Sequence, residues 1–277
     1  DHQLDPTWSA RLRLEMDQPG DFQTVTKMRP VVKDAWVRYA LNQHEITFGI
    51  TSTPTWGLIG DIWEYRSVEK TALDLQDWGS SRDFGISAQG PVPGSSRFRY
   101  HVMVGNGSSN KSEADRGKKV MGGLSFAPID QVVLEGYLDY EAMAGSRSRQ
   151  TSQLFAGFRT GALQGGLQWA HQVREGPGGT SQLDLASAFA TFELSSTTTV
   201  ITRVDRMFDP NSTGESIDYL PFSDEAASTF FLAGLDYNPV SHFHLIPNVE
   251  LIQYDEPAFG PTPETNVVPR LTIYYDF

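Results

Sequence analysis

Charged side chains recur at every second position in several segments of this chain. Arg11 and Arg13 have this spacing, and so do Asp139 and Glu141. A β-strand turns successive side chains to opposite faces, so each pair would lie on one face. Such a row could orient a charged solute or pair with a neighbouring strand, and two carboxyl groups with separated pKa values could catalyse hydrolysis. Which of these roles applies depends on whether the charged face lines a water-filled space or packs against other protein groups.

Nucleophilic and metal chemistry find little support. None of His101, His171, His242 and His244 lies two residues from a serine, as a Ser–His pair on one strand face would require. The chain has no cysteine, which excludes disulfides, thiolate metal sites and a cysteine nucleophile. His242 and His244 lack a third ligand at a fixed spacing. The sequence therefore predicts no enzyme, no metal site and no cofactor.

The last nine residues give the clearest indication of the environment on the two faces of a strand. Pro269, Leu271, Ile273 and Tyr275 alternate with polar residues, and the segment ends on an aromatic residue, Phe277. This pattern is typical of the final strand of an outer-membrane barrel, whose apolar side chains face lipid and whose polar ones face a wet interior. The alternative is an amphipathic strand of a soluble β-sandwich.

The composition is compatible with a barrel. The 277 residues are 39% hydrophobic and 12% aromatic, with a mean hydropathy of −0.35. No run of 18 apolar residues occurs, so no membrane-spanning helix is expected, but barrel strands escape that criterion. The net charge of −12 argues against a nucleic-acid partner. Asp1 follows no basic and apolar leader, so we expect any signal peptide to have been removed.

Alternation recurs along the chain and predicts about 14 strands, with 12 or 16 left open. The alternating segments are 8–16, 34–41, 44–51, 82–89, 97–104, 119–126, 132–140, 152–160, 163–173, 181–194, 198–207, 229–237, 243–254 and 267–277. Short connections alternate with long ones, the long ones including 17–33 and those after Thr51, Gly105, Tyr140, Val173, Met207 and Tyr254. Up-and-down barrels have one end of tight turns and one of longer loops. We therefore predict a single all-β domain over 1–277, a transmembrane antiparallel up-and-down β-barrel.

The segment 52–80 interrupts the alternation. Long loops inside compact folds are commonly functional, and this one carries more acidic than basic residues. It would form a constriction folded into the barrel or, alternatively, a surface loop with a short helix near 67–76. The candidate constriction residues are Asp61, Glu64, Arg66, Glu69 and Lys70.

Short pieces between residues 34 and 107 resemble the phosphate-selective porin family of Gram-negative outer membranes. These pieces are 34–39, 46–49, 53–54, 57–58, 64–67, 82–86 and 105–107. The resemblance implies a β-barrel diffusion channel with an inward-folded loop. The chain departs from the family at the constriction, where anion-selective members are rich in arginine and lysine.

If the apolar faces meet lipid, the opposite faces line the lumen. The candidate pore-lining residues are Arg11, Arg13, Arg38, Arg97, Arg99, Glu135, Asp139, Glu141, Arg159 and Arg270. The early strands hold mostly basic residues, whereas Glu135, Asp139 and Glu141 share one strand. Charges of opposite sign on facing walls would orient hydrated solutes, or they would pair across strands and close a narrow barrel.

The sequence thus predicts a porin of the bacterial outer membrane that passes small hydrophilic solutes or ions. The expected partners are the lipid bilayer and these solutes, and an oligomer is compatible with the pattern. The alternative function is a structural or anchoring barrel with a blocked lumen that binds a partner. Charge selectivity is left open, because acidic loops favour cations while the arginines favour anions.

Overall fold

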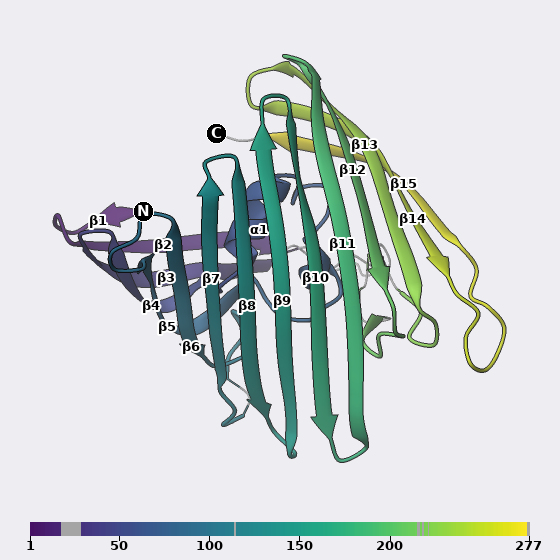
Figure 1. The fold of residues 1–277 in the computed structure, drawn as a ribbon, viewed down its shortest axis with the longest axis horizontal. Helices are drawn as coiled ribbons and strands as arrows, with labels where there is room; N and C mark the ends of the chain where they lie inside the picture. The colour runs from purple at the N-terminus through teal and green to yellow at the C-terminus, as the bar shows by residue number, and fades with distance from the viewer. Residues whose placement is uncertain (18–28, 114, 215–216, 218, 221, 276–277) are drawn as a thin grey trace.

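One antiparallel sheet forms most of the protein (Figure 1). The computed structural model describes residues 1–17, 29–113, 115–214, 217, 219–220 and 222–275. Two short helices lie between the fourth and fifth strands. The elements are β1 (His2–Gln3), β2 (Trp8–Asp17), β3 (Arg29–Leu41), β4 (His44–Ser52), α1 (Trp56–Trp63), α2 (Ala72–Leu75), β5 (Arg82–Pro91), β6 (Phe98–Gly105), β7 (Lys119–Ile129), β8 (Val132–Met143), β9 (Arg147–Thr160), β10 (Leu163–Gly176), β11 (Gly179–Ser195), β12 (Thr198–Met207), β13 (Ser228–Val240), β14 (Phe243–Tyr254) and β15 (Asn266–Tyr275).

The sheet has the up-and-down order that the alternation predicts. Each strand pairs with the next one in the sequence, from β1 to β15. Fourteen of the strands have eight residues or more, and β1 adds two residues beside β2. The prediction of about 14 antiparallel strands is therefore confirmed. Neither helix in the described residues is long and apolar enough to cross a membrane.

The connections differ between the two ends of the strands. One end has only short connections, at 4–7, 42–43, 92–97, 130–131, 161–162, 196–197 and 241–242. Left-handed backbone at Asn42 and Gly161 permits two of these tight reversals. At the other end the connections described in full are 53–81, 144–146, 177–178 and 255–265.

Two loops expected to be long are tight turns. The segments after Tyr140 and Val173 continue as strand, so that Met143 pairs with Arg147 and Gly176 with Gly179. Strands β8 to β11 are therefore longer than predicted, and in Figure 1 they reach furthest towards the lower end. The sequence predicts loops there because the residues are polar, but polar side chains are also compatible with strands that extend beyond an apolar belt.

Two other boundaries also differ from expectation. Strand β3 begins at Arg29 rather than Asp34, and the rest of the expected loop 17–33, residues 18–28, lies outside the described residues. The last two positions of the C-terminal segment, 276 and 277, also lie outside them. The faces of β15 follow the prediction: Leu271 and Ile273 are exposed, whereas Arg270 and Thr272 are half-buried.

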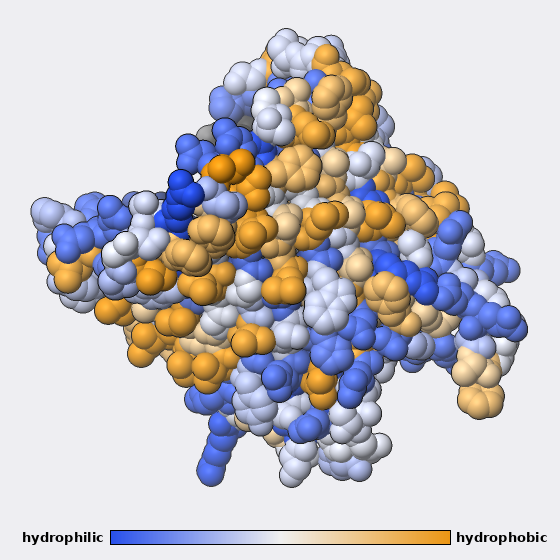
Figure 2. Space-filling view, viewed as in Figure 1, coloured by the Kyte–Doolittle hydropathy of each residue, from blue (hydrophilic) through white to orange (hydrophobic). Residues whose placement is uncertain are grey.

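The apolar face of the sheet points outward. On β4, Ile46 and Phe48 are more than half exposed, whereas Thr47 and Thr51 are buried. The same alternation holds on β6 to β10, and Figure 2 shows apolar side chains gathered over the middle of the visible face, with hydrophilic ones towards the end of the longer loops. Such an outward apolar surface fits contact with hydrocarbon, as the predicted barrel requires.

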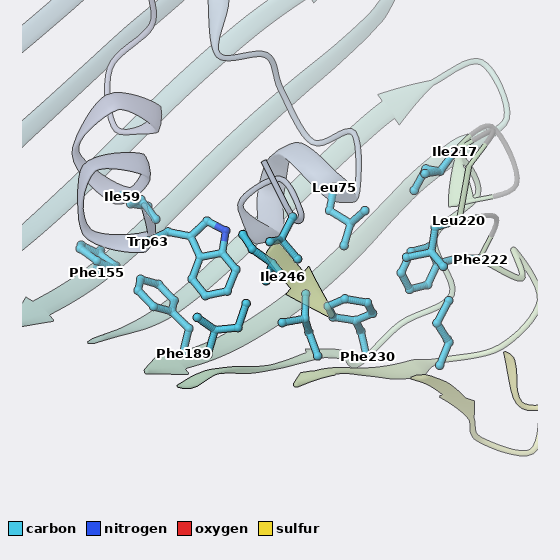
Figure 3. Close-up of a cluster of buried hydrophobic side chains, with 14 residues drawn as sticks. Ile59, Trp63, Leu75, Phe155, Phe189, Ile217, Leu220, Phe222, Phe230 and Ile246 are labelled. Carbon is cyan, nitrogen blue, oxygen red and sulfur yellow. The ribbon is translucent and has the colours of Figure 1, made fainter. Parts of the chain in front are cut away.

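The inner face is only partly polar, which corrects the expectation of a wet lumen throughout. Several apolar side chains on β9 and β11 to β14 are buried inside. They are Phe155, Phe189, Ile201, Phe230, Leu232, Ile246 and Ile252. They pack against Ile59 and Trp63 of α1, Leu75 of α2, and Phe222 of the connection 208–227 (Figure 3). We call these residues the dry cluster, because apolar contacts fill this part of the interior.

Candidate functional site

Segment 53–81 folds into the interior, where Ile59 and Trp63 join the dry cluster. Trp56 and Trp78 pack in a second apolar cluster with Met103, Met121 and Tyr137 of β6 to β8. The aromatic side chains Trp56, Trp63 and Trp78 are 4%, 1% and 0% exposed. Gly79 permits this arrangement, because a Cβ there would come within 2.6 Å of the Trp56 ring. We call residues 53–81 the constriction loop, after the role that the sequence predicts for this segment.

Hydrogen bonds join the constriction loop to strands β10, β12 and β13 of the wall. Gln172 of β10 donates to the Trp78 carbonyl at 3.0 Å, and Tyr65 donates to Asp236 of β13 at 3.1 Å. Arg203 of β12 donates to the Lys70 carbonyl and pairs with Asp205. A buried amide or ion pair left without its partner would be costly, so these contacts fix the loop against β10 to β13.

Glu69 lies at the centre of this attachment. Its Oε1 accepts hydrogen bonds from the Tyr219 hydroxyl at 2.8 Å and the Lys70 backbone N–H at 2.7 Å. Arg270 of β15 lies 3.7 Å from Oε2 and 3.0 Å from Glu250. Burial raises the pKa of Glu69 above its ordinary value, although Arg203 and the Tyr219 hydroxyl oppose that shift.

Three cavities with charged side chains in their lining lie between the constriction loop and strands β2 to β9. The outer cavity, about 320 Å³, lies near the longer loops and is lined by Asp83, Lys119, Glu141 and Arg149. Lys119 pairs with Asp139 at 3.0 Å and Glu141 at 3.4 Å, and Arg149 pairs with Glu141 at 3.2 Å. The predicted acidic row on β8 is therefore largely balanced by its neighbours.

The lateral cavity, about 460 Å³, lies between β2 and α1. Its lining includes Arg13, Arg82 and Asp61. Arg13 and Arg82 each approach Asp34 at 2.6 Å, and Arg11 lies 3.9 Å from the same carboxylate. Asp34 is 1% exposed, so one buried anion orients three guanidinium groups at this wall.

The inner cavity, about 330 Å³, lies towards the short turns. Its lining includes Thr55 and Asp61 of the constriction loop, Arg99 of β6 and Glu135 of β8. It shares Gly57 and Asp61 with the lateral cavity. Burial raises the pKa of the Asp61 carboxyl, and nearby Arg159 opposes the shift.

The other predicted site residues have separate positions. Arg38 pairs with Glu45 at 3.2 Å within the wall. Arg159 pairs with Glu64 at 2.6 Å, which joins β9 to the constriction loop. Arg66 pairs with Asp74 inside that loop at 2.6 Å.

Two more predicted residues lie at the margins. The exposed Lys70 ammonium lies 5.1 Å from the Tyr219 ring centre. Arg97 is exposed in the turn 92–97, where it donates to the Pro128 carbonyl.

Sequence reasoning missed Asp34 and the dry cluster. Asp34 shares the face of Arg38 by the two-residue period, so a signal for it was present. The run 230–233 is apolar on both faces of β13, which is typical of a strand with apolar surroundings on both sides. His171 and His244 hydrogen-bond Asp184 and Asp236 rather than a serine.

Several solved outer-membrane proteins have the same fold. No family model and no curated protein matches the chain. The anion-selective porin from Comamonas acidovorans is 12% identical with a TM-score of 0.66, covering 99% of this chain and 83% of its own. Salmonella typhi OmpF in complex with daunomycin is 10% identical with a TM-score of 0.64, covering 98% and 87%. The outer-membrane channel DcaP of Acinetobacter baumannii is 9% identical with a TM-score of 0.62, covering 98% and 80%.

Proposed function

We propose that the chain is a porin of the Gram-negative outer membrane through which small hydrophilic solutes and ions diffuse passively. The passage would follow the outer, lateral and inner cavities, between the constriction loop and strands β2 to β9. The observation that carries this proposal is their arrangement: Thr53, Gly57, Asp61 and Arg82 each line two of the three cavities.

The electrostatics of these cavities support ion passage. Each cavity has both acidic and basic side chains in its lining. Water-filled barrels use such charges to replace part of a solute's hydration and to orient it. The outward apolar face and the resemblance of residues 34–107 to the phosphate-selective porin family support the same function.

A blocked, anchoring barrel is the second candidate, because the dry cluster fills part of the interior. The two functions differ in conductance. Purified protein in planar bilayers should carry current in KCl, and a salt gradient should give a reversal potential that reports the preferred ion. Absence of current from folded, inserted protein would reject the porin and favour the anchor.

A bulky side chain at Gly57 tests the route. A Cβ added there meets no atom within 4 Å, so Gly57→Phe would extend into the space between the lateral and inner cavities. We expect single-channel conductance to fall to roughly half or less because the bore narrows. Gly178→Phe is the matched control, since Gly178 is equally free of contacts but lies in the turn 177–178. Equal conductance in the two variants would show that solutes take another route.

A further inference from the structure

Arg99 and Glu135 lie in one row across three neighbouring strands. Arg99 on β6 pairs in register with Ser125 on β7, and Ser125 pairs with Glu135 on β8. All three side chains line the inner cavity. Two strand spacings put the Arg99 and Glu135 backbones about 10 Å apart.

The residues between the two charges are small. Ser125 and Gly123 of β7 also line the cavity, and a Cβ at Gly123 would lie 3.6 Å from Oε2 of Glu135 without clashing. Because no large side chain lies between Arg99 and Glu135 on β7, the space between the two charges is open to a solute.

Both charged groups have unused binding capacity. Glu135 is 8% exposed, and its Oε1 has no hydrogen-bond partner among the described residues. Thr55 hydrogen-bonds the carboxylate, but only one of its two oxygens is satisfied in this way. Within the described part of the chain, the Arg99 guanidinium forms neither an ion pair nor a hydrogen bond, unlike Arg13, Arg38 and Arg82. An unpaired buried carboxylate oxygen is costly, so a donor from a solute would be stabilising there.

We propose that the inner cavity is a binding subsite for small zwitterions of the α-amino-acid type. The ammonium would donate to Glu135, and the carboxylate would accept from Arg99. Two charge-assisted hydrogen bonds of about 2.8 Å and about 3 Å between the charges of such a solute span roughly 9 Å, a length that two flexible side chains on backbones about 10 Å apart can bracket. This inference rests on the proposed porin function and gives the channel a preferred solute class.

A matched set of solutes tests the subsite. Alanine is zwitterionic, lactamide is neutral, lactate is an anion and alaninamide is a cation, and the four have nearly the same size. Exchange of each labelled solute is measured in proteoliposomes, beside KCl conductance in planar bilayers. We expect alanine exchange to exceed that of the other three and to saturate with concentration, because alanine alone can use both charges.

Variants then assign the preference to the two residues. Glu135→Gln and Arg99→Gln should each lower the alanine-to-lactamide ratio about fivefold, since each removes one ion pair with the solute. The double variant Arg99→Glu with Glu135→Arg should recover much of that ratio, because a zwitterion can bind in the reverse orientation. Arg147→Gln and Glu193→Gln alter exposed residues elsewhere and serve as controls.

The outcomes separate this inference from the proposed function. No KCl current from the unmodified protein would reject the porin itself. Normal current with equal exchange of alanine and lactamide would overturn the zwitterion subsite alone. Faster exchange of alaninamide than of alanine would also overturn it and would identify a cation site at Glu135.

Discussion

The Tyr219 hydroxyl donates a 2.8 Å hydrogen bond to Oε1 of Glu69. This contact joins the connection 208–227 to the constriction loop, two segments that lie far apart in the sequence. The Tyr219 ring also lies 5.1 Å below the Lys70 ammonium and 5.5 Å from the Arg270 guanidinium. One aromatic side chain therefore lies close to Glu69 and Lys70 of the loop and to Arg270 of the wall.

Removing this hydroxyl should loosen the constriction loop. Tyr219→Phe leaves the ring in place but deprives a buried carboxylate of a donor, which costs about 1.5–3 kcal/mol. We expect a lower free energy of unfolding in detergent and more open-channel current noise. Tyr140→Phe is the control, because Tyr140 is exposed on the outward face. If both variants behave like the unmodified protein, the hydrogen bond does not hold the loop.

The raised pKa of Glu69 predicts a pH dependence. Its ordinary value is 4.5, and burial raises the pKa in the folded protein. The folded state therefore binds this proton more readily than the unfolded state, so this contribution to stability is present at low pH and declines as pH rises from about 4.5 through the raised pKa. Guanidinium unfolding at a series of pH values should show the decline. Glu69→Gln should flatten it, and an unchanged slope in that variant would contradict the assignment.

The dry cluster should contribute strongly to stability. Phe189 and Phe192 both belong to β11, but Phe189 is 7% exposed inside the cluster and Phe192 is 46% exposed outside. Phe189→Ala should lower the free energy of unfolding by about 3–5 kcal/mol, as for a phenylalanine removed from a packed core. Phe192→Ala is the matched control and should cost much less in detergent. Similar losses in the two variants would mean that the cluster is loosely packed.

Asp34 should tune charge selectivity. Asp34→Asn removes the anion that faces Arg13 and Arg82, and so leaves the wall of the lateral cavity more positive. We expect the anion-to-cation permeability ratio to rise roughly twofold in a KCl gradient, because a charged lining concentrates counter-ions. Asp130→Asn, in the exposed turn 130–131, provides the control. A reversal potential that does not move would indicate that ions bypass this wall.

The strands of the sheet and their two faces could be predicted from the sequence, since a period of two determines which side chains share a face. The same period does not determine where a strand ends. Polar residues such as Arg147 and Ser148 are as compatible with a strand outside an apolar belt as with a loop, and the extra length of β8 and β9 was missed for that reason.

The candidate site was less predictable because its contacts join distant segments. The alternation predicts that Arg11 and Arg13 share one face of a strand. Their approach to Asp34 depends on the register between β2 and β3, which the alternation does not specify. The attachment of Glu69 depends on a loop that turns inward and meets Tyr219, 150 residues away in the sequence. No local sequence pattern specifies a contact between segments so far apart in the chain.

The dry cluster gives part of this barrel the thermodynamics of a globular interior. Its apolar contacts are stabilised by the hydrophobic effect, which weakens on cooling. The backbone hydrogen bonds between the strands depend much less on that effect. Chilling should therefore loosen the packing around the constriction loop, while its hydrogen bonds and the paired strands persist. Fluctuations of the loop, and with them the noise of the current, should then be larger in the cold than at higher temperature.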